Sequence, residues 1–407
     1  MKTAQWGLSL PALACAVLLT GPVRAQGNDP RPPAEPAADL ARALAEAWPE
    51  RPEWLDMYTD ILQGSQLGPN DGWFRRAVAQ TRFGWDATRK RFDRDGDGKV
   101  ARSEFPGDDA DFARLDRDHD KALTRADFDF SAHALAPSPG AMIFQRADRD
   151  GNGKVTREEI DALFSQVDTD GHGFLSLSDL QESFPMPSMG GPAPRGRSGG
   201  PSKETLVRGL FRQEIGSLQP GPALGESAPD FTLKTVDGKQ EITLSKKIGP
   251  KPVVLVFGNF TCGPFRSQAG NVEKLYQRYR DRATFVMVYV REAHPIDGWV
   301  MESNDRVGVH LAQPKTYGER VGVAQMCSRS LSLGMPMLVD TIDDTVGARY
   351  SGMPSRLYLI DRQVKVAYKS GRGPFGFKPA ELEQSLVLSL QDDASHASEP
   401  VHQAKAK

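Results

Sequence analysis

The sequence predicts a multidomain chain in which an all-α module is followed by an α/β domain. An acidic loop motif recurs four times between residues 93 and 184, with apolar residues flanking each copy. Strand-like and helix-like segments then alternate from about residue 224 to residue 391, which is typical of an α/β domain. A Pro- and Gly-rich stretch at 185–203 separates the two parts and indicates a flexible linker.

The first residues have the features of an export signal. Lys2 supplies a positive charge, residues 8–19 form an apolar stretch, and residues 23–25 fit a small-residue cleavage site. We therefore expect a signal peptide at 1–25 and an exported protein, either periplasmic or secreted. The apolar stretch is too short for a good membrane span, and no later run approaches the length required. The sequence around Cys15 faintly resembles a lipoprotein box, but the apolar run continues past Cys15, so lipid anchoring is not expected.

Charge and cysteine content narrow the function classes. The 407 residues include 51 Lys and Arg and 53 Asp and Glu, so neither a general polyanion-binding surface nor a nucleic-acid partner is expected. After signal cleavage two cysteines remain, too few for an exported protein stapled by disulfides. Two interpretations stay open. Cys262 and Cys327 form one bridge, permanent or catalytic, or Cys262 is free and functional while Cys327 is a buried apolar residue.

Composition places the boundaries of the predicted segments. The apolar residues between 53 and 92 occur at helical spacing, and a short helix is expected within 204–218. The predicted segments are the signal peptide at 1–25, a Pro/Ala-rich tether at 26–52, the all-α module at 53–184, the linker with its short helix at 185–222, the α/β domain at 223–391 and a disordered tail at 392–407.

The first acidic repeat matches a calcium-binding loop. Oxygen-bearing side chains occupy loop positions 1, 3, 5 and 12, and Gly98 at position 6 permits the sharp turn. This is the EF-hand pattern, and calcium is the hard cation that such a cage of oxygens suits. Val100 at position 8 is expected to pair with a partner loop as a short β-bridge. The expected ligands of loop one are Asp93, Asp95, Asp97, the carbonyl of Lys99, and Glu104.

The other three repeats match this pattern to different degrees. Loop three is as good as loop one, loop two has Lys121 in place of the glycine, and loop four has a histidine at position 5. Loops two and four close with aspartate, which is one methylene shorter than glutamate and therefore less suited to bidentate capture. We expect the highest affinity in loops one and three, then loop two, then loop four. The ligands would be Asp116, Asp118, Asp120, Ala122 and Asp127 in loop two; Asp148, Asp150, Asn152, Lys154 and Glu159 in loop three; and Asp168, Asp170, His172, Phe174 and Asp179 in loop four.

The four repeats together argue for calcium as the cofactor and against merely solvated acidic turns. The spacing of the repeats predicts two pairs of hands joined by short helices. Calcium outside the cell is abundant, and sites of this kind often bind it weakly, so a structural role is favoured over a sensing role.

The α/β domain carries Cys262 between a predicted strand and a predicted helix. The helix N-terminus is expected to stabilise the reactive thiolate at this position. Phe265 stands where a Cys-x-x-Cys motif has its second thiol, so the attacking sulfur has no local partner to resolve it. The predicted segments are strands at 252–258, 284–290, 335–340, 352–361 and 364–369, and helices at 266–281 and 320–333.

The order of these segments resembles the thioredoxin-like fold, and three sequence blocks resemble the iodothyronine deiodinase family. In the thioredoxin-like fold the proline that matches Pro354 is cis and packs beside the reactive cysteine. The resemblance covers about 224–391. The blocks read FGNFTCGPF at 257–265, EAHPIDGW at 292–299, and RLYLI at 356–360 with GRGP at 371–374.

The resemblance implies reductive chemistry in which a chalcogen nucleophile takes a halogen from an aromatic ring and an external thiol regenerates the nucleophile. Position by position, Cys262 resembles the nucleophile, which is selenocysteine in animal members, and Thr261 resembles the adjacent hydroxyl that serves proton transfer. His294 and Arg372 resemble the residues that hold the phenol and carboxylate ends of the ligand, with Pro354 beside the site. The implied partners are a small-molecule or thiol substrate and an external thiol reductant.

The sequence also departs from the family pattern. Ser355 stands where the family has a catalytic glutamate, and a family histidine is missing near residues 313–315. Cysteine is also a poorer nucleophile for this reaction than selenocysteine, so a general thiol reductase or peroxidase role is easier to support than iodothyronine turnover. Glu292 and Asp297 act as acid–base groups or fix their loop, and the sequence does not separate these roles.

Three functions therefore stay open. The first is an exported, calcium-binding, thiol-dependent oxidoreductase. The second is a thiol peroxidase that uses Cys262 and Cys327. The third is a non-catalytic calcium-binding adaptor in which the redox fold is only a scaffold.

Overall fold

The chain is represented by a computed structural model that describes residues 36–47, 52–65, 78–130, 138–184, 201–247, 249, 251–373 and 375–397. The predicted signal peptide with Cys15, most of the predicted linker and most of the predicted tail lie outside the described residues. Within the described part of the chain, no helix is both long enough and apolar enough to cross a membrane.

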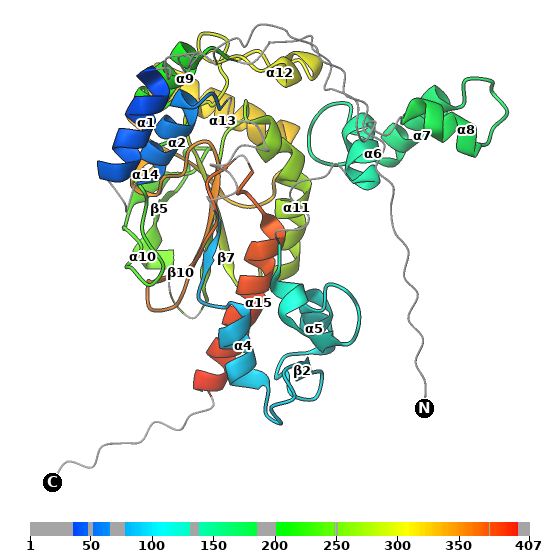
Figure 1. Ribbon diagram of the computed structural model, residues 1–407, viewed down its shortest axis with the longest axis vertical. Helices are drawn as coiled ribbons and strands as arrows, with labels where there is room; N and C mark the ends of the chain where they lie inside the picture. Colours follow the sequence, from blue (N-terminus) through cyan, green and yellow to red (C-terminus); the bar gives the residue numbers. More distant parts are fainter. Residues whose placement is uncertain are drawn as a thin grey trace, which may run out of the picture.

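The centre of the α/β domain is a six-stranded mixed sheet with the order β1-β10-β9-β6-β7-β8 (Figure 1). β6, β7 and β8 run parallel to one another, whereas β9, β10 and β1 join through antiparallel pairs. Every residue of β6 is buried, which its apolar, β-branched run favours in a central strand. The strands are β1 (Gln80–Thr81), β6 (Val253–Gly258), β7 (Thr284–Tyr289), β8 (Met337–Val339), β9 (Arg356–Ile360) and β10 (Val366–Lys369).

Helices pack on this sheet and confirm the alternation of an α/β domain. α11 (Gly263–Tyr279) and α15 (Pro379–Ala397) lie side by side, and the Tyr279 hydroxyl donates to Glu383 across them (2.9 Å). α11 begins at Gly263 rather than at residue 266, because Pro264 suits the first turn of a helix. The other elements are α10 (Leu244–Lys247), α12 (Glu302–Arg306), α13 (Tyr317–Ser330), α14 (Thr345–Arg349), β4 (Thr232–Lys234) and β5 (Glu241–Thr243).

The first loop pair, residues 93–127, lies beside α15 at one end of the sheet (Figure 1). Strands β2 (Val100–Ala101) and β3 (Ala122–Leu123) pair antiparallel with Val100 opposite Leu123, which confirms the β-bridge expected at Val100. Apolar side chains of this pair belong to the same buried core as the sheet. The neighbouring helices are α4 (Trp85–Phe92), α5 (Asp109–Leu115) and the 3-10 helix η1 (Arg125–Phe128).

The second loop pair, residues 148–179, belongs to a group of helices that projects from the side of the molecule (Figure 1). These helices enclose a small core of their own. In capping boxes, Thr156 and Ser176 bond to Glu159 and Asp179, the residues that close the two loops. The helices are α6 (Pro139–Ala147), α7 (Arg157–Val167) and α8 (Leu177–Ser183), and their shared core contains Ala147, Leu163 and Val167.

Three helices from the amino end and the linker region lie together on another side of the α/β domain. α1 (Pro36–Ala47) falls inside the predicted tether, because the Ala-rich run at 36–47 has high helix propensity. α2 (Glu53–Leu62) packs on α9 (Lys203–Phe211), the helix expected within 204–218. The buried contacts of this group come from Met57, Ile61, Leu206, Leu210 and Ile215.

Candidate functional site

Cys262 lies between the end of β6 and the first turn of α11, where it is the N-cap residue. Only 1% of its surface is exposed. Burial raises the pKa of the Cys262 thiol to about 11, and the backbone of Phe265 and the charge of Arg266 oppose this rise without cancelling it. The expectation that the helix N-terminus holds this sulfur as a thiolate is therefore wrong for this conformation, because desolvation outweighs the helix.

Asn259 organises the loop that carries Cys262. Its Oδ1 accepts hydrogen bonds from the backbone N–H of Cys262 (3.0 Å), the hydroxyl of Thr261 (3.2 Å) and the backbone N–H of Ala293 (3.2 Å). Its Nδ2 donates to the carbonyl of Pro354 (2.9 Å). One buried amide therefore joins the thiol loop, the loop after β7 and the turn before β9. No role was predicted for Asn259, although a polar amide directly after an apolar strand is a signal that could have found it.

Glu292 lies behind the same loop and is fully buried. It accepts hydrogen bonds from the Thr261 N–H (2.8 Å) and from the Tyr289 hydroxyl, and the Tyr289 oxygen accepts from the Phe260 N–H (3.0 Å). Burial raises the pKa of Glu292, although these hydrogen bonds favour the carboxylate. Glu292 therefore fixes the loop, from a position in which burial disfavours its charge.

His294 contacts Thr261 from the loop after β7. Its backbone N–H donates to Thr261 Oγ1 (3.0 Å), and its Nδ1 lies 3.0 Å from the carbonyl oxygen of Trp299. A carbonyl only accepts, so this contact assigns the proton to Nδ1 and leaves Nε2 as an acceptor. Burial lowers the pKa of His294 to about 4, so the ring is neutral at pH 7. The rings of His294 and Trp299 meet edge to face with their centroids 4.7 Å apart.

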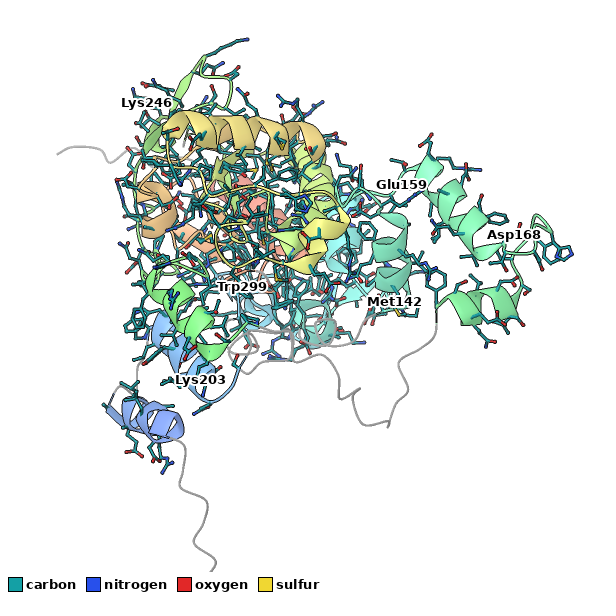
Figure 2. All side chains as sticks on the ribbon, turned by 90° about the horizontal axis from the view of Figure 1, so that it is seen from above. Met142, Glu159, Asp168, Lys203, Lys246 and Trp299 are labelled. Atoms are coloured by element: carbon teal, nitrogen blue, oxygen red, sulfur yellow. The ribbon has the colours of Figure 1, made fainter. Side chains whose placement is uncertain are left out.

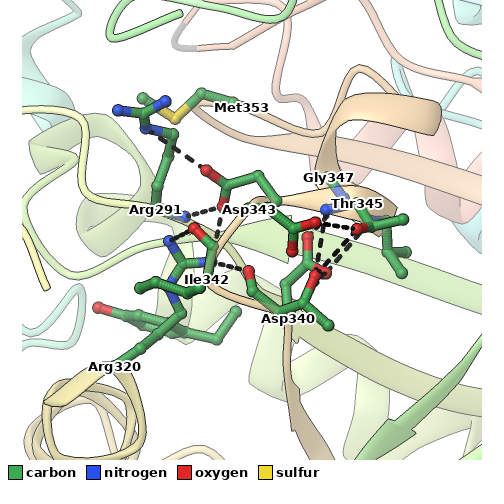
Figure 3. Close-up of polar contacts among 12 residues, drawn as sticks. Arg291, Arg320, Asp340, Ile342, Asp343, Thr345, Gly347 and Met353 are labelled. Carbon is green, nitrogen blue, oxygen red and sulfur yellow. Dashed lines mark hydrogen bonds and ion pairs between the residues drawn. The ribbon is translucent and has the colours of Figure 1, made fainter. Parts of the chain in front are cut away.

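A charged network holds the segment that follows β7 (Figure 3). Asp344 Oδ1 accepts from the backbone N–H of Arg291 (3.2 Å) and from Arg320 Nη1 (2.7 Å). Asp340 accepts from the backbone N–H of Gly347 (2.6 Å). These contacts join the loop after β7 to α13 and to the segment around α14. They fix the position of the site without placing a charged side chain on the thiol.

The turn before β9 brings Pro354 and Ser355 to the site. The Met353–Pro354 peptide bond is cis, as expected. The Ser355 hydroxyl is close enough to Cys262 to favour its thiolate, an effect smaller than that of burial. This hydroxyl is buried and makes no hydrogen bond with a described residue. Ser355 therefore places a neutral hydroxyl where the family resemblance implies a carboxyl.

Arg372 is fully buried, and Glu53 from α2 occupies its guanidinium. Glu53 Oε2 lies 3.0 Å from Arg372 Nη2 and 2.9 Å from Arg356 Nη2. Arg372 also donates to Ser351 Oγ (2.8 Å) and to Met57 Sδ (3.7 Å). Although burial opposes its ionisation, the two arginines hold the pKa of Glu53 below its usual value. A ligand carboxylate would have to displace Glu53 before it could bind Arg372 as predicted.

The other candidate residues have structural contacts. Asp297 Oδ1 accepts from the Gln313 N–H (2.8 Å), and the Gln313 side chain makes two hydrogen bonds, each of 3.0 Å, with the Glu292 backbone. Cys327 lies on α13, where burial raises its pKa well above the usual value. Cys262 and Cys327 are both free thiols, so the permanent bridge is not present in this structure.

Acidic loops one and three bring their carboxylates together as a calcium site requires. In each loop, one oxygen from each of three acidic residues lies within 4.8 Å of the others. Oxygens held about 2.3–2.6 Å from one cation lie at most about 5 Å apart, so both sets fit calcium. The glycine at position 6 has positive φ and donates its N–H to the first aspartate. The two sets are Asp93, Asp95 and Glu104, and Asp148, Asp150 and Glu159.

Loops two and four differ in how far their side chains converge. Loop two forms the same kind of cluster, and Lys121 at position 6 takes the left-handed conformation (φ 72°) that glycine takes elsewhere. In loop four, the described side chains form no such cluster, and His172 Nδ1 lies 2.7 Å from Asp170 instead. The geometry sets loop four apart from the other three loops, and the predicted order of affinity stays a prediction. The cluster in loop two consists of Asp116, Asp118 and Asp127.

Known proteins share both parts of this arrangement. The profile of the family described as iodothyronine deiodinase matches residues 207–388, and that of the EF-hand domain pair matches residues 109–184. Thyroxine 5-deiodinase of Sparus aurata is 31% identical over 184 residues, which are 45% of this chain and 67% of that protein.

Two further relatives agree over a similar region. Type I iodothyronine deiodinase of Xenopus laevis is 30% identical over 39% of this chain and 61% of its own length. Thyroxine 5-deiodinase of Gallus gallus is 35% identical over 40% of this chain and 62% of its own length. The chain thus spans less than two thirds of the length of these two relatives.

Solved structures are similar at a lower level. A secreted Mycobacterium tuberculosis disulfide oxidoreductase homologous to E. coli DsbE is 17% identical, with a TM-score of 0.29, and covers 39% of this chain and 95% of its own. Peroxidoxin BcpB from the same organism is 18% identical, with a TM-score of 0.29, and covers 42% of this chain and 97% of its own. These similarities are too low to bear on function.

Proposed function

This chain belongs to the iodothyronine deiodinase family, and we propose that it is an exported, calcium-binding, thiol-dependent oxidoreductase with Cys262 as its nucleophile. The reaction is reductive. Cys262 takes a halogen from an aromatic ring or attacks the sulfur of a disulfide, and an external thiol restores the cysteine. The deiodinase names of the relatives supply the halogenated aromatic ring as one substrate class.

The convergence of Cys262, Thr261 and His294 carries this proposal. Asn259 accepts hydrogen bonds from the Thr261 hydroxyl and the Cys262 N–H, and Thr261 accepts one from the His294 N–H. These contacts lie at the N-terminus of α11, and Asn259 joins them to Pro354, which follows a cis peptide bond. The Thr261 hydroxyl and the buried Glu292 carboxyl lie at the loop of Cys262, and the backbone of His294 joins its neutral ring to the same loop. The arrangement supports nucleophilic chemistry that is coupled to proton transfer.

Proton transfer relies on Glu292 because Ser355 provides no carboxyl. Glu292 is hydrogen bonded to the Thr261 backbone, and burial raises its pKa, so it is suited to hold a proton near the site. The Cys262 thiol is protonated and buried in the described conformation. Reaction therefore requires an opening of the loop that exposes the sulfur and lowers its pKa.

The proposed dehalogenation balances as a two-electron reduction. The Cys262 thiolate takes the halogen and becomes a sulfenyl halide, while the ring carbon takes a proton. One external thiol then displaces halide to form a mixed disulfide, and a second thiol releases the reduced enzyme. Disulfide reduction by Cys262 uses the same final step.

Substrate binding by Arg372 and His294 also requires movement. Glu53 occupies Arg372 in the described conformation, and α2 carries Glu53. A substrate with a carboxylate would replace Glu53 with a group of the same charge. His294 Nε2 would accept a hydrogen bond from a phenol hydroxyl, since Nδ1 is used by Trp299.

Calcium enters the proposal through loops one, two and three. The acidic side chains of each loop would hold one calcium ion. The charge of the ion would offset the repulsion between the carboxylates that converge in the loop. Export rests on the signal sequence at residues 1–25, and calcium outside the cell would keep the better loops filled.

A turnover screen tests the proposed function. The wild type and Cys262→Ser are compared against halogenated phenols, disulfides and peroxides, with an external thiol and with or without calcium. We expect turnover by the wild type of a halogenated phenol or a disulfide, and loss of that turnover in Cys262→Ser. Equal activity of the two proteins, or no activity toward any of these substrates, would contradict the proposal.

The pH dependence of Cys262 modification tests its ionisation. Because the thiol pKa is raised to about 11, the thiolate fraction rises about tenfold per pH unit below that value. We expect the alkylation rate, followed by mass spectrometry, to rise steadily from pH 7 to pH 10. A plateau near pH 8 would contradict a resting state in which the Cys262 thiol is buried and protonated.

Two alternatives have distinct outcomes. In a peroxidase that uses Cys262 and Cys327, peroxide converts the two free thiols to a disulfide, and non-reducing peptide mapping would find that bridge. In a calcium-binding adaptor, Cys262→Ser leaves every partner and phenotype intact. Cys327 has the features of a core residue, which favours the single-cysteine mechanism.

A further inference from the structure

The third calcium loop rests directly on the helix that follows Cys262. Gly153, at position 6 of this loop, meets Gly270 on α11, and each glycine lies where a Cβ atom would overlap the backbone of the other segment. A Cβ at Gly270 would overlap the Gly153 carbonyl oxygen, and one at Gly153 would overlap the Arg266 carbonyl oxygen. The two backbones therefore touch with no side chain between them.

Further contacts surround this pair of glycines. Lys154 Nζ donates to the carbonyl of Ser332 (3.1 Å), and Gly151 lies so close to Val307 that a Cβ there would be 2.7 Å from its Cγ1. Figure 2 shows Glu159 on the part of the second loop pair nearer the main body and Asp168 farther out. Loop three thus contacts α11 and the segments after α12 and α13, whereas loop four projects away.

Arg266 connects this contact to the thiol loop. Its carbonyl faces Gly153, while its buried side chain donates to the Phe260 carbonyl and to Asn304 Oδ1 (2.8 Å). Asn304 Nδ2 in turn donates to the Thr261 carbonyl (3.0 Å). Arg266 therefore contacts loop three with its backbone and supports the thiol loop with its side chain. It holds the Phe260 carbonyl directly and the Thr261 carbonyl through Asn304.

Asp148, the first ligand of loop three, also acts on this arginine. Burial lowers the pKa of Arg266, and the charge of Asp148 is among the nearby charges that oppose this shift. The calcium loop therefore lies within electrostatic reach of the guanidinium that supports the thiol loop.

We propose that calcium binding in loop three controls the accessibility of the Cys262 thiol, through the contact of Gly153 with Gly270 and the support that Arg266 gives to the thiol loop. This inference rests on the proposed function, because it concerns the same cysteine and assigns calcium to loop three. A filled loop is held in one shape by its ligands and keeps the first turns of α11 in place. An empty loop carries repelling carboxylates, loosens, and releases these turns, which exposes Cys262.

The experiment measures Cys262 alkylation by mass spectrometry of the full chain, in calcium and in chelator. In the wild type, calcium should slow alkylation by about fivefold or more, the lower end of ordinary coupling between sites. Glu159→Gln, which removes the closing ligand of loop three, should react at the fast rate in both conditions. Glu104→Gln, the matched change in loop one, should keep the calcium response. A calcium-independent wild type, or a response lost in Glu104→Gln and kept in Glu159→Gln, would overturn the proposal.

A pair of glycine variants tests the contact itself. Gly270→Ala places a methyl group against the Gly153 carbonyl, whereas the new methyl group of Gly322→Ala on α13 meets no other described segment within 4 Å. With calcium present, Gly270→Ala should react at the fast rate and bind calcium more weakly in loop three, while Gly322→Ala should match the wild type. Slow alkylation of a folded Gly270→Ala would overturn the proposal. This readout needs no substrate, so a failed turnover screen and a failed coupling are distinguishable.

Discussion

The two loop pairs carry the same calcium motif but are built into the molecule in different ways. The first pair is joined by β2 and β3 and packs on α15. Its arrangement is held by the side chain of Asp111, which accepts from Arg282 in the turn after α11 (2.6 and 2.9 Å) and from Gln391 on α15 (3.0 Å). Gln384 on α15 also donates to the Asp127 carbonyl (3.0 Å). The first pair is therefore packed into the α/β domain through a shared core and these hydrogen bonds.

The second pair has its own small core and contacts the α/β domain through loop three. This pair exposes several apolar side chains, among them Phe174 in loop four and Leu177 on α8 (63% and 71% exposed). A segment with so few buried contacts opens more readily than the domain that it touches. One motif can therefore contribute stability where its core is shared with the domain, and control where its contact with the domain is narrow.

The largest difference is expected from core truncation. Leu123→Ala removes a fully buried side chain of the shared core and should cost about 2–5 kcal/mol of the free energy of unfolding. Leu163→Ala, in the separate core, should leave the main unfolding transition in place. Urea unfolding followed by circular dichroism measures both. Equal losses in the main transition would show that the pairs are not embedded differently.

Calcium should stabilise the two pairs unequally. A ligand at 100 times its Kd stabilises a folded protein by about 2.7 kcal/mol. Glu104→Gln should remove a gain of this size from the main transition, because loop one unfolds with the domain. Glu159→Gln should shift that transition much less, by about 1 kcal/mol, which corresponds to a coupling of about fivefold. Thermal unfolding in calcium and in chelator checks this, and the reverse pattern would contradict the comparison.

The contacts between the first pair and the α/β domain should contribute more to the free energy of unfolding than the contacts of the second pair. Asp111→Ala removes an almost fully buried carboxylate that accepts charge-assisted hydrogen bonds, each worth about 1.5–3 kcal/mol. We expect the whole domain to lose stability by an amount in this range in denaturant unfolding. No loss would mean that the first pair packs on α15 without depending on this residue.

The smallest effect is expected from Lys154→Ala. Its hydrogen bond to the Ser332 carbonyl is exposed, so its loss should change the main unfolding free energy by less than about 0.5 kcal/mol. The same variant tests whether loop three is positioned by the glycine contact or by this lysine. If alkylation of Cys262 in Lys154→Ala no longer depends on calcium, the hydrogen bond of Lys154 couples loop three to the thiol. The contact between Gly153 and Gly270 would then not be sufficient for this coupling.

The features that were predicted from the sequence are those encoded by neighbouring residues. The strand that leads to Cys262, the helix after it and the acidic clusters of loops one, two and three are local patterns, and the structure has all of them, although the helix begins at Gly263. The pKa of Cys262 was misjudged because burial depends on the whole fold. A prediction from the helix dipole considers only the residues next to the sulfur and takes no account of the distant segments that bury it.

The contacts that were missed join residues far apart in the sequence. Glu53 precedes Arg372 by 319 residues, and no local pattern marks it as the partner of a buried arginine. The meeting of Gly153 with Gly270 is equally invisible, since neither glycine is unusual in its own segment. Asn259 differs, because its polar amide at the end of an apolar strand could have been recognised.

Hydrogen exchange at the amides of residues 265–270 reports on the first turns of α11 without using the thiol, so it is the sharpest test of whether loop three holds this helix. We expect calcium to slow exchange at these amides in the wild type and in Glu104→Gln, but not in Glu159→Gln. Exchange at 265–270 that is unaffected by calcium in the wild type, or that still responds in Glu159→Gln, would contradict the proposal that loop three holds this helix.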